Sequence, residues 1–465
     1  MSSTVLRWYP KRRNRDSAAD IRRSRGEGVV STIVFSLVGL PNIDHTTSLV
    51  NSQPPPGRRS PATGRRSGLA AYPRQPSVHL TEDHEAFRES VRAFVEREIR
   101  PHADEWERAG IFPRDLYRQA AKAGLLGLRY DPMWGGSGLD YFATVVLCEE
   151  LAKCDTLGTA VGLMAQAEFA LSVLADEASD SLKATWLEPA IQGELIGAIG
   201  VSEPGAGSDV AGLSTRARRD GDDYIISGQK TFITNGTRAD FITLAVRTGE
   251  PGPRGISLVV FPTATPGFEV GRKLDKLGAR ASDTGELFFD SCRIPATNVV
   301  GVEGSGMRYI LSHFAGERLV IAALAVGVME HLIEMALDYG NERNVFGTPL
   351  LGFQTWQHRL AEMATRLEAT RQLTYQAADL LNRGDHTGEI AVSMAKSHAA
   401  DSVKFVAAEV LQLHGGFGQM EESPVPRYYR DVAGFSIGAG TSEIMREIVA
   451  RALIQTRAAG TKERK

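Results

Sequence analysis

A glycine-rich stretch near the middle of the chain, Gly200–Gly212, constrains the fold more than any other part of the sequence. It reads GVSEPGAGSDVAG, so its backbone can approach a ligand closely while its small side chains offer little to a hydrophobic core. No Gly-Lys-Ser/Thr follows, which excludes a P-loop, and Gly205-Ala206-Gly207 lacks the third glycine of a dinucleotide fingerprint. The stretch is therefore expected to be a ligand-binding loop of another kind.

The spacing of apolar residues changes twice along the chain and predicts three domains. It is helical from 80 to 196 and again from 304 to 458, where long patterned segments suit an antiparallel bundle. Between them, from 197 to 303, short β-rich runs are bounded by Gly, Pro or Asp. We therefore expect an α+β multidomain protein with an N-terminal α-helical domain, a middle β-barrel or sandwich domain and a C-terminal four-helix bundle, followed by a tail at 459–465.

Local signals refine this division. Thr81 is a candidate N-cap for the first helix, which Pro101 is expected to end or kink. In the middle domain we expect short strands, and Ser227-Gly228 separates the first two of them. The predicted strands are Tyr224–Ile226, Thr231–Thr234, Ile256–Phe261 and Leu287–Phe289. In the last domain one apolar stripe, expected to lie in the bundle core, comprises Ala399, Val403, Val406, Val410 and Leu413.

Residues 1–79 differ in composition from the rest of the chain. They carry thirteen Lys or Arg residues against four acidic ones, with three consecutive prolines at 54–56. Because such a segment cannot bury enough apolar surface to fold, we expect a disordered extension. Its apolar run from Val29 to Leu40 is shorter than the about 20 residues that a membrane span needs. With a disordered extension we expect a cytoplasmic protein. The alternative interpretation of this segment is a transit peptide, which would place the protein in the mitochondrial matrix.

The overall composition excludes several classes of function. The chain has 465 residues, 42% of them apolar, and a formal charge of -3, so nothing favours nucleic acid as a partner. Its three cysteines, Cys148, Cys154 and Cys292, form no CxxC pair, and their odd number argues for a reducing compartment. We expect neither a disulfide framework nor a metal site.

One carboxylate interrupts an apolar helical stripe in the last domain. Glu317 lies on the face formed by Ile310, Phe314, Ile321, Leu324 and Val328. Burying a carboxylate is unfavourable, so Glu317 is either paired with its neighbour Arg318 or held with a raised pKa for chemistry. The pattern alone leaves both interpretations open.

The Gly200–Gly212 loop and the segment Phe232-Ile233-Thr234-Asn235-Gly236 together resemble the acyl-CoA dehydrogenase family of flavoproteins. The likeness extends from about residue 80 to 455. It implies FAD-dependent α,β-dehydrogenation of a branched or medium-chain acyl-CoA to the 2-enoyl-CoA, in fatty acid or branched-chain amino acid catabolism. It also implies electron-transfer flavoprotein as a partner and a homotetramer, or at least a dimer. An acyl-CoA oxidase, a flavin-dependent hydroxylase and a non-catalytic flavin- or acyl-CoA-binding assembly protein remain alternatives.

The resemblance also assigns the reacting groups. The family's usual catalytic glutamate lies just before a Gly-Thr-Ser motif, where this chain has Ala439. A subset resembling isovaleryl-CoA dehydrogenase carries the base in a Glu-Arg-Leu sequence instead, and Glu317-Arg318-Leu319 matches that sequence. The resemblance therefore implies Glu317 as the general base and the backbone N–H of Ala439 as a donor to the thioester carbonyl.

Binding residues carry over position by position. The residues matched to FAD contacts are Val201, Ser202, Ser208, Phe232, Thr234, Arg343, Phe346, Gln354, Gln412, Gly415, Gly416 and Thr441. Of these, Arg343, Phe346 and Gln354 match residues that reach the FAD of a neighbouring subunit. The residues assigned to acyl-CoA are Ser208, Arg318, Gly438 and Gly440. Straight-chain relatives commonly carry a bulky aromatic residue where Gly438 stands, so the resemblance implies room for a branched acyl group.

Overall fold

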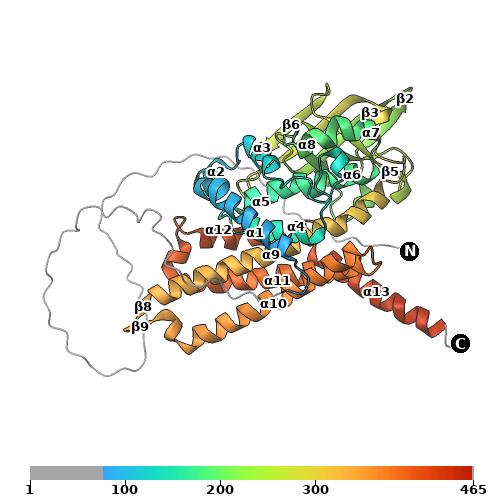
Figure 1. Ribbon diagram of the computed structural model, residues 1–465. Helices are drawn as coiled ribbons and strands as arrows, with labels where there is room; N and C mark the ends of the chain where they lie inside the picture. Colours follow the sequence, from blue (N-terminus) through green and yellow to red (C-terminus); the bar gives the residue numbers. More distant parts are fainter. Residues whose placement is uncertain (1–76, 463–465) are drawn as a thin grey trace, which may run out of the picture. The chain divides into compact units, whose positions relative to one another are not determined.

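The computed structural model describes residues 77–462, which form helices, then a curled sheet, then longer helices (Figure 1). The predicted fold class is confirmed. The extension predicted over 1–79 lies outside the described residues except for its last three, and the domain boundaries stay a prediction. Helix α13 (Ser442–Lys462) continues four residues into the predicted tail.

The first part of the described chain is helical. Its first helix begins where the sequence predicts, because the Thr81 hydroxyl accepts a hydrogen bond from the His84 backbone N–H at 3.4 Å. Pro101 lies in a 3₁₀ turn, Arg100–His102, that follows a π-helical turn and separates the first two helices. The helices are α1 (Glu82–Phe94), α2 (Ala103–Ala109), α3 (Asp115–Lys122), α4 (Tyr141–Leu151), α5 (Leu157–Met164), α6 (Ser172–Glu177), α7 (Asp180–Leu182) and α8 (Glu188–Ile191).

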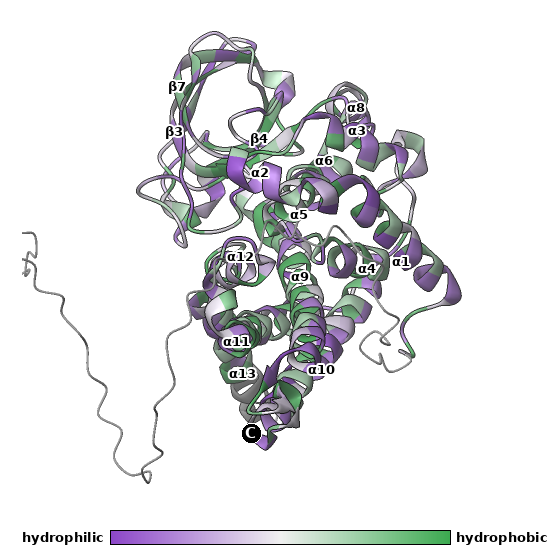
Figure 2. Cartoon of the chain, turned by 90° about the vertical axis from the view of Figure 1, so that its left-hand side faces the viewer, coloured by the Kyte–Doolittle hydropathy of each residue, from purple (hydrophilic) through white to green (hydrophobic). Residues whose placement is uncertain are grey.

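The middle part is a seven-stranded sheet that curls on itself (Figure 2). Its strand order is β1-β4-β2-β3-β7-β6, with β5 paired to β4. Inside the curl, Phe261, Phe268 and Phe289 form an aromatic cluster with ring centroids 4.9–5.4 Å apart. The strands are β1 (Gly197–Gly200), β2 (Arg216–Asp220), β3 (Asp223–Thr234), β4 (Phe241–Arg247), β5 (Ile256–Pro262), β6 (Phe268–Lys273) and β7 (Thr284–Pro295).

One prediction for the sheet is wrong. Ser227-Gly228 does not separate two strands, because β3 runs through it as one strand of 12 residues paired with β7. The register shifts between Ile226 and Gly228, which marks a β-bulge. Gly228 has a φ of 149°, and an added Cβ would lie 2.7 Å from the Cα of Thr215. The glycine therefore allows a close backbone approach within the strand rather than a turn.

The last part consists of long helices that pack around a buried helix, α9 (Gly306–Glu342). The other helices are α10 (Gln354–Asn382), α11 (Gly388–His414), α12 (Pro424–Asp431) and α13 (Ser442–Lys462), and a small hairpin joins β8 (Asn344–Val345) to β9 (Thr348–Pro349). The apolar stripe predicted on α11 is buried, as expected. The sequence predicts a single apolar face on α9, but every residue from Ala315 to Ile333 is buried, so this part of the helix is buried on all of its faces.

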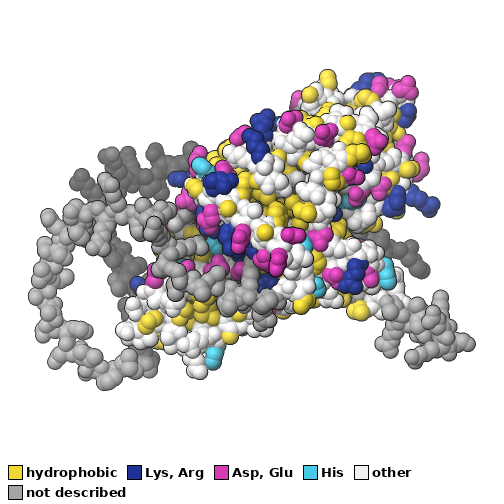
Figure 3. All heavy atoms as spheres, in the orientation of Figure 1, with side chains coloured by type: hydrophobic (Ala, Val, Ile, Leu, Met, Phe, Trp, Pro, Cys, Tyr) yellow, Lys and Arg dark blue, Asp and Glu magenta, His cyan; other side chains and the backbone are white. Residues whose placement is uncertain are grey.

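Two helical stretches, Leu157–Glu177 and Gly306–Glu342, are long and apolar enough to cross a membrane by length and composition. In each, 89% of the most apolar window is buried inside the protein, so this composition reflects core packing. The face shown in Figure 3 carries positive and negative side chains interspersed over both the helices and the sheet, in keeping with the formal charge of -3.

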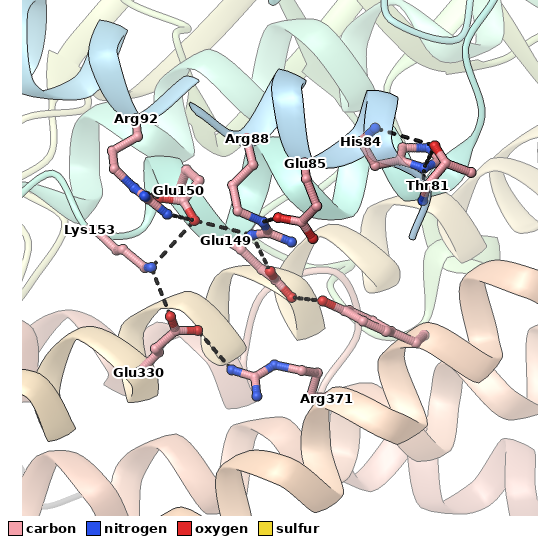
Figure 4. A network of polar contacts seen from close by, with 11 residues as sticks. Thr81, His84, Glu85, Arg88, Arg92, Glu149, Glu150, Lys153, Glu330 and Arg371 are labelled. Carbon is pink, nitrogen blue, oxygen red and sulfur yellow. Dashed lines mark hydrogen bonds and ion pairs between the residues drawn. The ribbon is translucent and has the colours of Figure 1, made fainter. Parts of the chain in front are cut away.

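A network of buried ion pairs joins the first helices to the last ones (Figure 4). On the side of α1 and α4, Arg88 donates to Glu149 at 2.7 Å and to Glu150 at 3.1 Å. The network continues to α9 and α10, where Glu330 accepts from Lys153 at 3.0 Å and from Arg371 at 2.7 Å. Charges from four helices thus compensate one another in the interior, where an unpaired charge is strongly unfavourable.

Replacing Arg371 by Met should destabilise the protein by about 3–5 kcal/mol, because the buried carboxylate of Glu330 would lose its 2.7 Å pair with the guanidinium of Arg371. The matched control is Arg366→Met on the same helix, where the pair with Glu362 is largely exposed and is worth about 1 kcal/mol or less. Denaturant-induced unfolding of both variants measures the difference. Equal shifts in the two midpoints would contradict the importance of the buried network.

Candidate active site

The carboxylate of Glu317 is buried on α9 without a hydrogen-bond partner. Its exposed fraction is 5%, and its Oε1 accepts no hydrogen bond from any residue that the structure describes. Burial raises the pKa of Glu317 to about 8, and only the charge of Arg318 opposes that rise. This carboxyl can therefore hold or release a proton near neutral pH.

The other buried charged side chains of α9 have partners on neighbouring elements. Glu330 accepts from Lys153 and Arg371, and His331 lies 2.7 Å from a carboxylate oxygen of Asp155. Arg318 donates to Glu389 of α11 at 3.3 Å rather than to Glu317. Of the two interpretations left open by the sequence, the structure therefore favours the raised pKa over the pair with Arg318.

A strained loop from Gly438 to Thr441 lies against Arg318. An added Cβ on Gly440 would lie 4.0 Å from the Arg318 Nε, an atom that itself has no hydrogen-bond partner among the described residues. Ala439 has a φ of 53° and Gly440 a φ of 91°, so two consecutive residues adopt the left-handed conformation that alanine rarely takes. Thr441 directly precedes α13, and its hydroxyl accepts a hydrogen bond from the Ile444 N–H at 3.3 Å.

The loop leaves three backbone donors free, since the N–H groups of Ala439, Gly440 and Thr441 have no partner among the described residues. The Gly438 N–H donates to the Gly434 carbonyl at 3.0 Å, and the carbonyl of Gly440 accepts from the Nζ of Lys396. Between these two bonds, the N–H of Ala439 has no partner among the residues that the structure describes. The loop that holds the predicted oxyanion donor thus lies against Arg318, the residue that follows the predicted base in the sequence.

The Gly200–Gly212 loop forms an open cradle whose base is fixed by a buried ion pair. Glu203 accepts from Lys230 at 2.7 Å and from the backbone N–H groups of Ser214 and Thr215 at 2.7 and 3.0 Å. Above this base the cradle is exposed, and an added Cβ on Gly205 or Gly207 would meet nothing within 4 Å. The predicted residue Ser208 is exposed, and Val201 and Ser202 are half-buried.

Phe232 adjoins this cradle and has the properties of a stacking surface. It is 70% exposed and has a φ of 61°, an unusual conformation for an aromatic residue. Thr234, two residues on, is half-buried. An exposed ring held by a strained backbone, next to free backbone donors in the cradle, fits a flat aromatic cofactor with a phosphate-bearing tail.

The remaining residues assigned to the cofactor lie elsewhere. Tyr339, near the end of α9, stacks on His414 with ring centroids 4.4 Å apart, so the ends of α9 and α11 adjoin. Since α9 rises about 1.5 Å per residue, Tyr339 is about 30 Å from Arg318 along the helix. The exposed residues grouped near this distant end are Arg343, Phe346, Gln354, Gln412, Gly415 and Gly416. These residues therefore lie far along α9 from Arg318 and from the 438–441 loop that contacts it.

Sequence reasoning missed two buried lysines near these sites. Lys230 supports the cradle, and Lys396 contacts the 438–441 loop; both side chains are fully buried. A signal for Lys396 was present, because it extends the stripe of Ala399 and Val403 by one helical turn. Its partner, 44 residues further along the chain, was not visible in the sequence.

Three family models match consecutive parts of the chain. They describe the N-terminal domain of acyl-CoA dehydrogenase over 81–194, its middle domain over 198–292 and its C-terminal domain over 304–454. The long-chain specific acyl-CoA dehydrogenase of mitochondria from Sus scrofa is 38% identical over 81% of this chain and 87% of its own length. The mitochondrial isobutyryl-CoA dehydrogenase of Dictyostelium discoideum is 35% identical over 81% and 91%.

Solved structures agree with these matches. A probable acyl CoA dehydrogenase from Mycobacterium abscessus superposes with a TM-score of 0.79 at 43% identity, covering 81% of this chain and all of the other. A chain from the structure titled electron transferring flavoprotein of Acidaminococcus fermentans has a TM-score of 0.79 at 35% identity, covering 81% of this chain and 99% of the other.

The buried state of Glu317 predicts a pH-dependent cost in stability. Its ordinary pKa is 4.5, whereas the folded protein raises it to about 8, so between these values the folded state binds more protons than the unfolded state. Stability should therefore fall as pH rises through this window, and the full penalty applies above pH 8. We expect Glu317→Gln to change stability little near pH 5 but to raise it by roughly 2–5 kcal/mol at pH 8.5–9.

Unfolding midpoints of the flavin-containing protein at the two pH values check this expectation. The control is Glu334→Gln, on the same helix at a half-buried position. A change in stability for Glu317→Gln that is the same at both pH values would show that this carboxyl is not perturbed.

Proposed function

This chain belongs to the acyl-CoA dehydrogenase family, whose members dehydrogenate acyl-CoA thioesters, and we propose that it does so with FAD and with Glu317 as the general base. The observation that carries the proposal is the unpartnered, buried carboxylate of Glu317, whose pKa is raised to about 8. The other buried acidic and basic side chains of α9, Arg318, Glu330 and His331, each contact a side chain of opposite type on a neighbouring segment. A protein that only binds its ligand has no need of such a group.

The cradle supports FAD as the cofactor. Its open glycines and exposed Ser208 suit the approach of a pyrophosphate, and the exposed ring of Phe232 suits stacking on a flavin. When bound, FAD supplies the acceptor for the hydride that leaves the β-carbon. The residues proposed to hold FAD in the same subunit are Val201, Ser202, Ser208, Phe232, Thr234 and Thr441.

The chain's own groups would act on the α-carbon. The α-proton of a thioester is weakly acidic, so the carbonyl must be polarised before a carboxylate can remove that proton. The free N–H of Ala439 is suited to donate to the carbonyl oxygen, and Glu317 in its apolar surroundings is suited to take the proton. Ser208, Arg318, Gly438 and Gly440 would contact the acyl-CoA and fix its orientation.

The assembly and the partner are part of the same proposal. The residues assigned to a second FAD contact lie about 30 Å from the base, and among them Phe346 is 97% exposed, which supports a homotetramer or at least a dimer. We propose electron-transfer flavoprotein as the electron acceptor, as the family resemblance implies. We place the protein in the cytoplasm, with the mitochondrial matrix as the alternative because several relatives are mitochondrial.

One experiment separates this function from the alternatives. The purified protein should be yellow, and an acyl-CoA added without oxygen should bleach it. Persistent colour with every acyl-CoA would point to the hydroxylase or to the inert assembly protein, whereas rapid re-oxidation of the bleached protein in air would point to the oxidase.

Glu317→Gln should retain FAD yet reduce it on the order of 10²–10⁴-fold more slowly, because an amide keeps the shape of the carboxyl but cannot accept the proton. Stopped-flow bleaching by an acyl-CoA under anaerobic conditions measures this rate. Adding Ala439→Glu to that variant should restore part of the activity. Flavin reduction at the parental rate in Glu317→Gln would rule out this assignment of the base.

A branched acyl group should be preferred over a straight one, because Gly438 leaves space beside the reacting carbons. An added Cβ there would meet only the Gly434 carbonyl, at an ordinary 3.7 Å, so a side chain can be introduced without a backbone clash. We expect a higher kcat/KM for isovaleryl-CoA than for butyryl-CoA, by roughly 10–200-fold, and expect Gly438→Tyr to reverse the order.

The control for this substitution is Gly434→Tyr, an exposed glycine one turn upstream whose added Cβ would meet nothing within 4 Å. It should leave the order of the two substrates unchanged. A preference of the parent enzyme for butyryl-CoA would remove the branched substrate and leave the dehydrogenase activity intact.

A further inference from the structure

Lys396 is a buried cation that the proposed reaction leaves without a role. It lies on α11 with no exposed surface, and its Nζ donates to the backbone carbonyl of Gly440. A lysine is rarely buried unless its ammonium group is needed for a specific contact. Burial, together with the nearby charge of Arg318, lowers the pKa of Lys396 to about 8.

The charges around Lys396 do not explain its burial as an ordinary ion pair. Arg318 of α9 and Lys404 of α11 repel it, and Glu443, at the exposed start of α13, attracts it. Arg318 itself is paired with Glu389 of α11. The contact that Lys396 makes is therefore with the backbone of the 438–441 loop.

That loop needs an anchor at this position. Ala439 and Gly440 have φ values of 53° and 91°, and alanine adopts the first only when its surroundings hold it there. Upstream, the Gly438 N–H is bonded to the Gly434 carbonyl at 3.0 Å. Downstream, the charged hydrogen bond from Lys396 fixes the Gly440 carbonyl. The free N–H of Ala439 lies between these two anchors.

We propose that Lys396 is a positioning residue, which holds the loop so that the Ala439 N–H points at the thioester carbonyl. The inference rests on the proposed function, because it assigns Lys396 an effect on the acidity of the α-proton. A donor displaced by about 1 Å loses much of its effect on the developing charge. Loss of Lys396 should therefore slow proton abstraction without removing Glu317.

The test measures proton abstraction alone. The substrate is an acyl-CoA in which sulfur replaces the β-carbon, so that the base can remove an α-proton but no β-hydride can leave. In D₂O, Glu317 takes the α-proton, and the enolate recovers a deuteron from the exchanged carboxyl; mass spectrometry of the thioester measures the exchange. We expect Lys396→Met to slow exchange at saturating analogue roughly 10–100-fold, with flavin content and thermal midpoint close to parental.

Two further variants make the result specific. Lys396→Arg, which can still donate to the Gly440 carbonyl, should recover most of the rate. The control is Lys404→Met, which also removes a lysine contact made from α11, a 2.7 Å bond to the Ser436 hydroxyl. Its exchange rate should stay within about 2-fold of the parental rate, because this change does not move an oxyanion donor.

Parental exchange in Lys396→Met would overturn the inference. So would a variant that loses flavin or stability while each remaining folded, flavin-containing site exchanges at the parental rate, since that result would show a purely structural role. If Lys396→Met does not fold, Lys396→Gln takes its place with the same outcomes. An unmodified enzyme that exchanges no α-proton would instead refute the proposed function, and the positioning role with it.

Discussion

Burial of one helix on every side is the constraint on which the rest of this structure depends. Helix α9 packs against α4 and α6 of the first part, β5 of the sheet, and α10 and α11 of the last part. Any charge on such a helix loses its hydration, and the loss must be compensated by neighbours. Glu330, His331 and Arg318 have such partners, in the turn between α4 and α5, on α10 and on α11. Glu317 differs from these three residues, because its Oε1 has no hydrogen-bond partner among the described residues.

The same packing makes that carboxyl suitable for chemistry. Because Arg88, Lys153 and Arg371 tie α1, α4 and α10 to the centre of the molecule, α9 cannot shift without breaking buried ion pairs. A base on such a helix is held in place by the core, and its raised pKa follows from the same lack of water. The penalty in stability and the proposed catalytic role are thus two results of one desolvated group.

Much of this arrangement could be predicted from the sequence, because it depends on local spacing. The period of the apolar residues predicts the succession of helices, sheet and helices, and it places Glu317 on a buried stripe. The rest depends on contacts between distant segments. Gly228 in β3 allows the close approach of Thr215, and Arg318 donates to Glu389, 71 residues away, rather than to Glu317. No local pattern carries such information, and the same holds for the bond between Lys396 and Gly440.

The separation of the 438–441 loop from the helix that carries Glu317 has a consequence for how enzymes of this kind diversify. Under the proposed assignment the loop would contribute to binding through the backbone N–H of Ala439, while Gly438 has room for a side chain. Under the same assignment, mutations at Gly438 would alter which acyl groups fit, while proton abstraction would be left to Glu317 in the core. Under the proposed assignment, selection on the range of substrates and selection on the reaction rate act on different segments. Substrate preference can therefore change during evolution while the general base is retained.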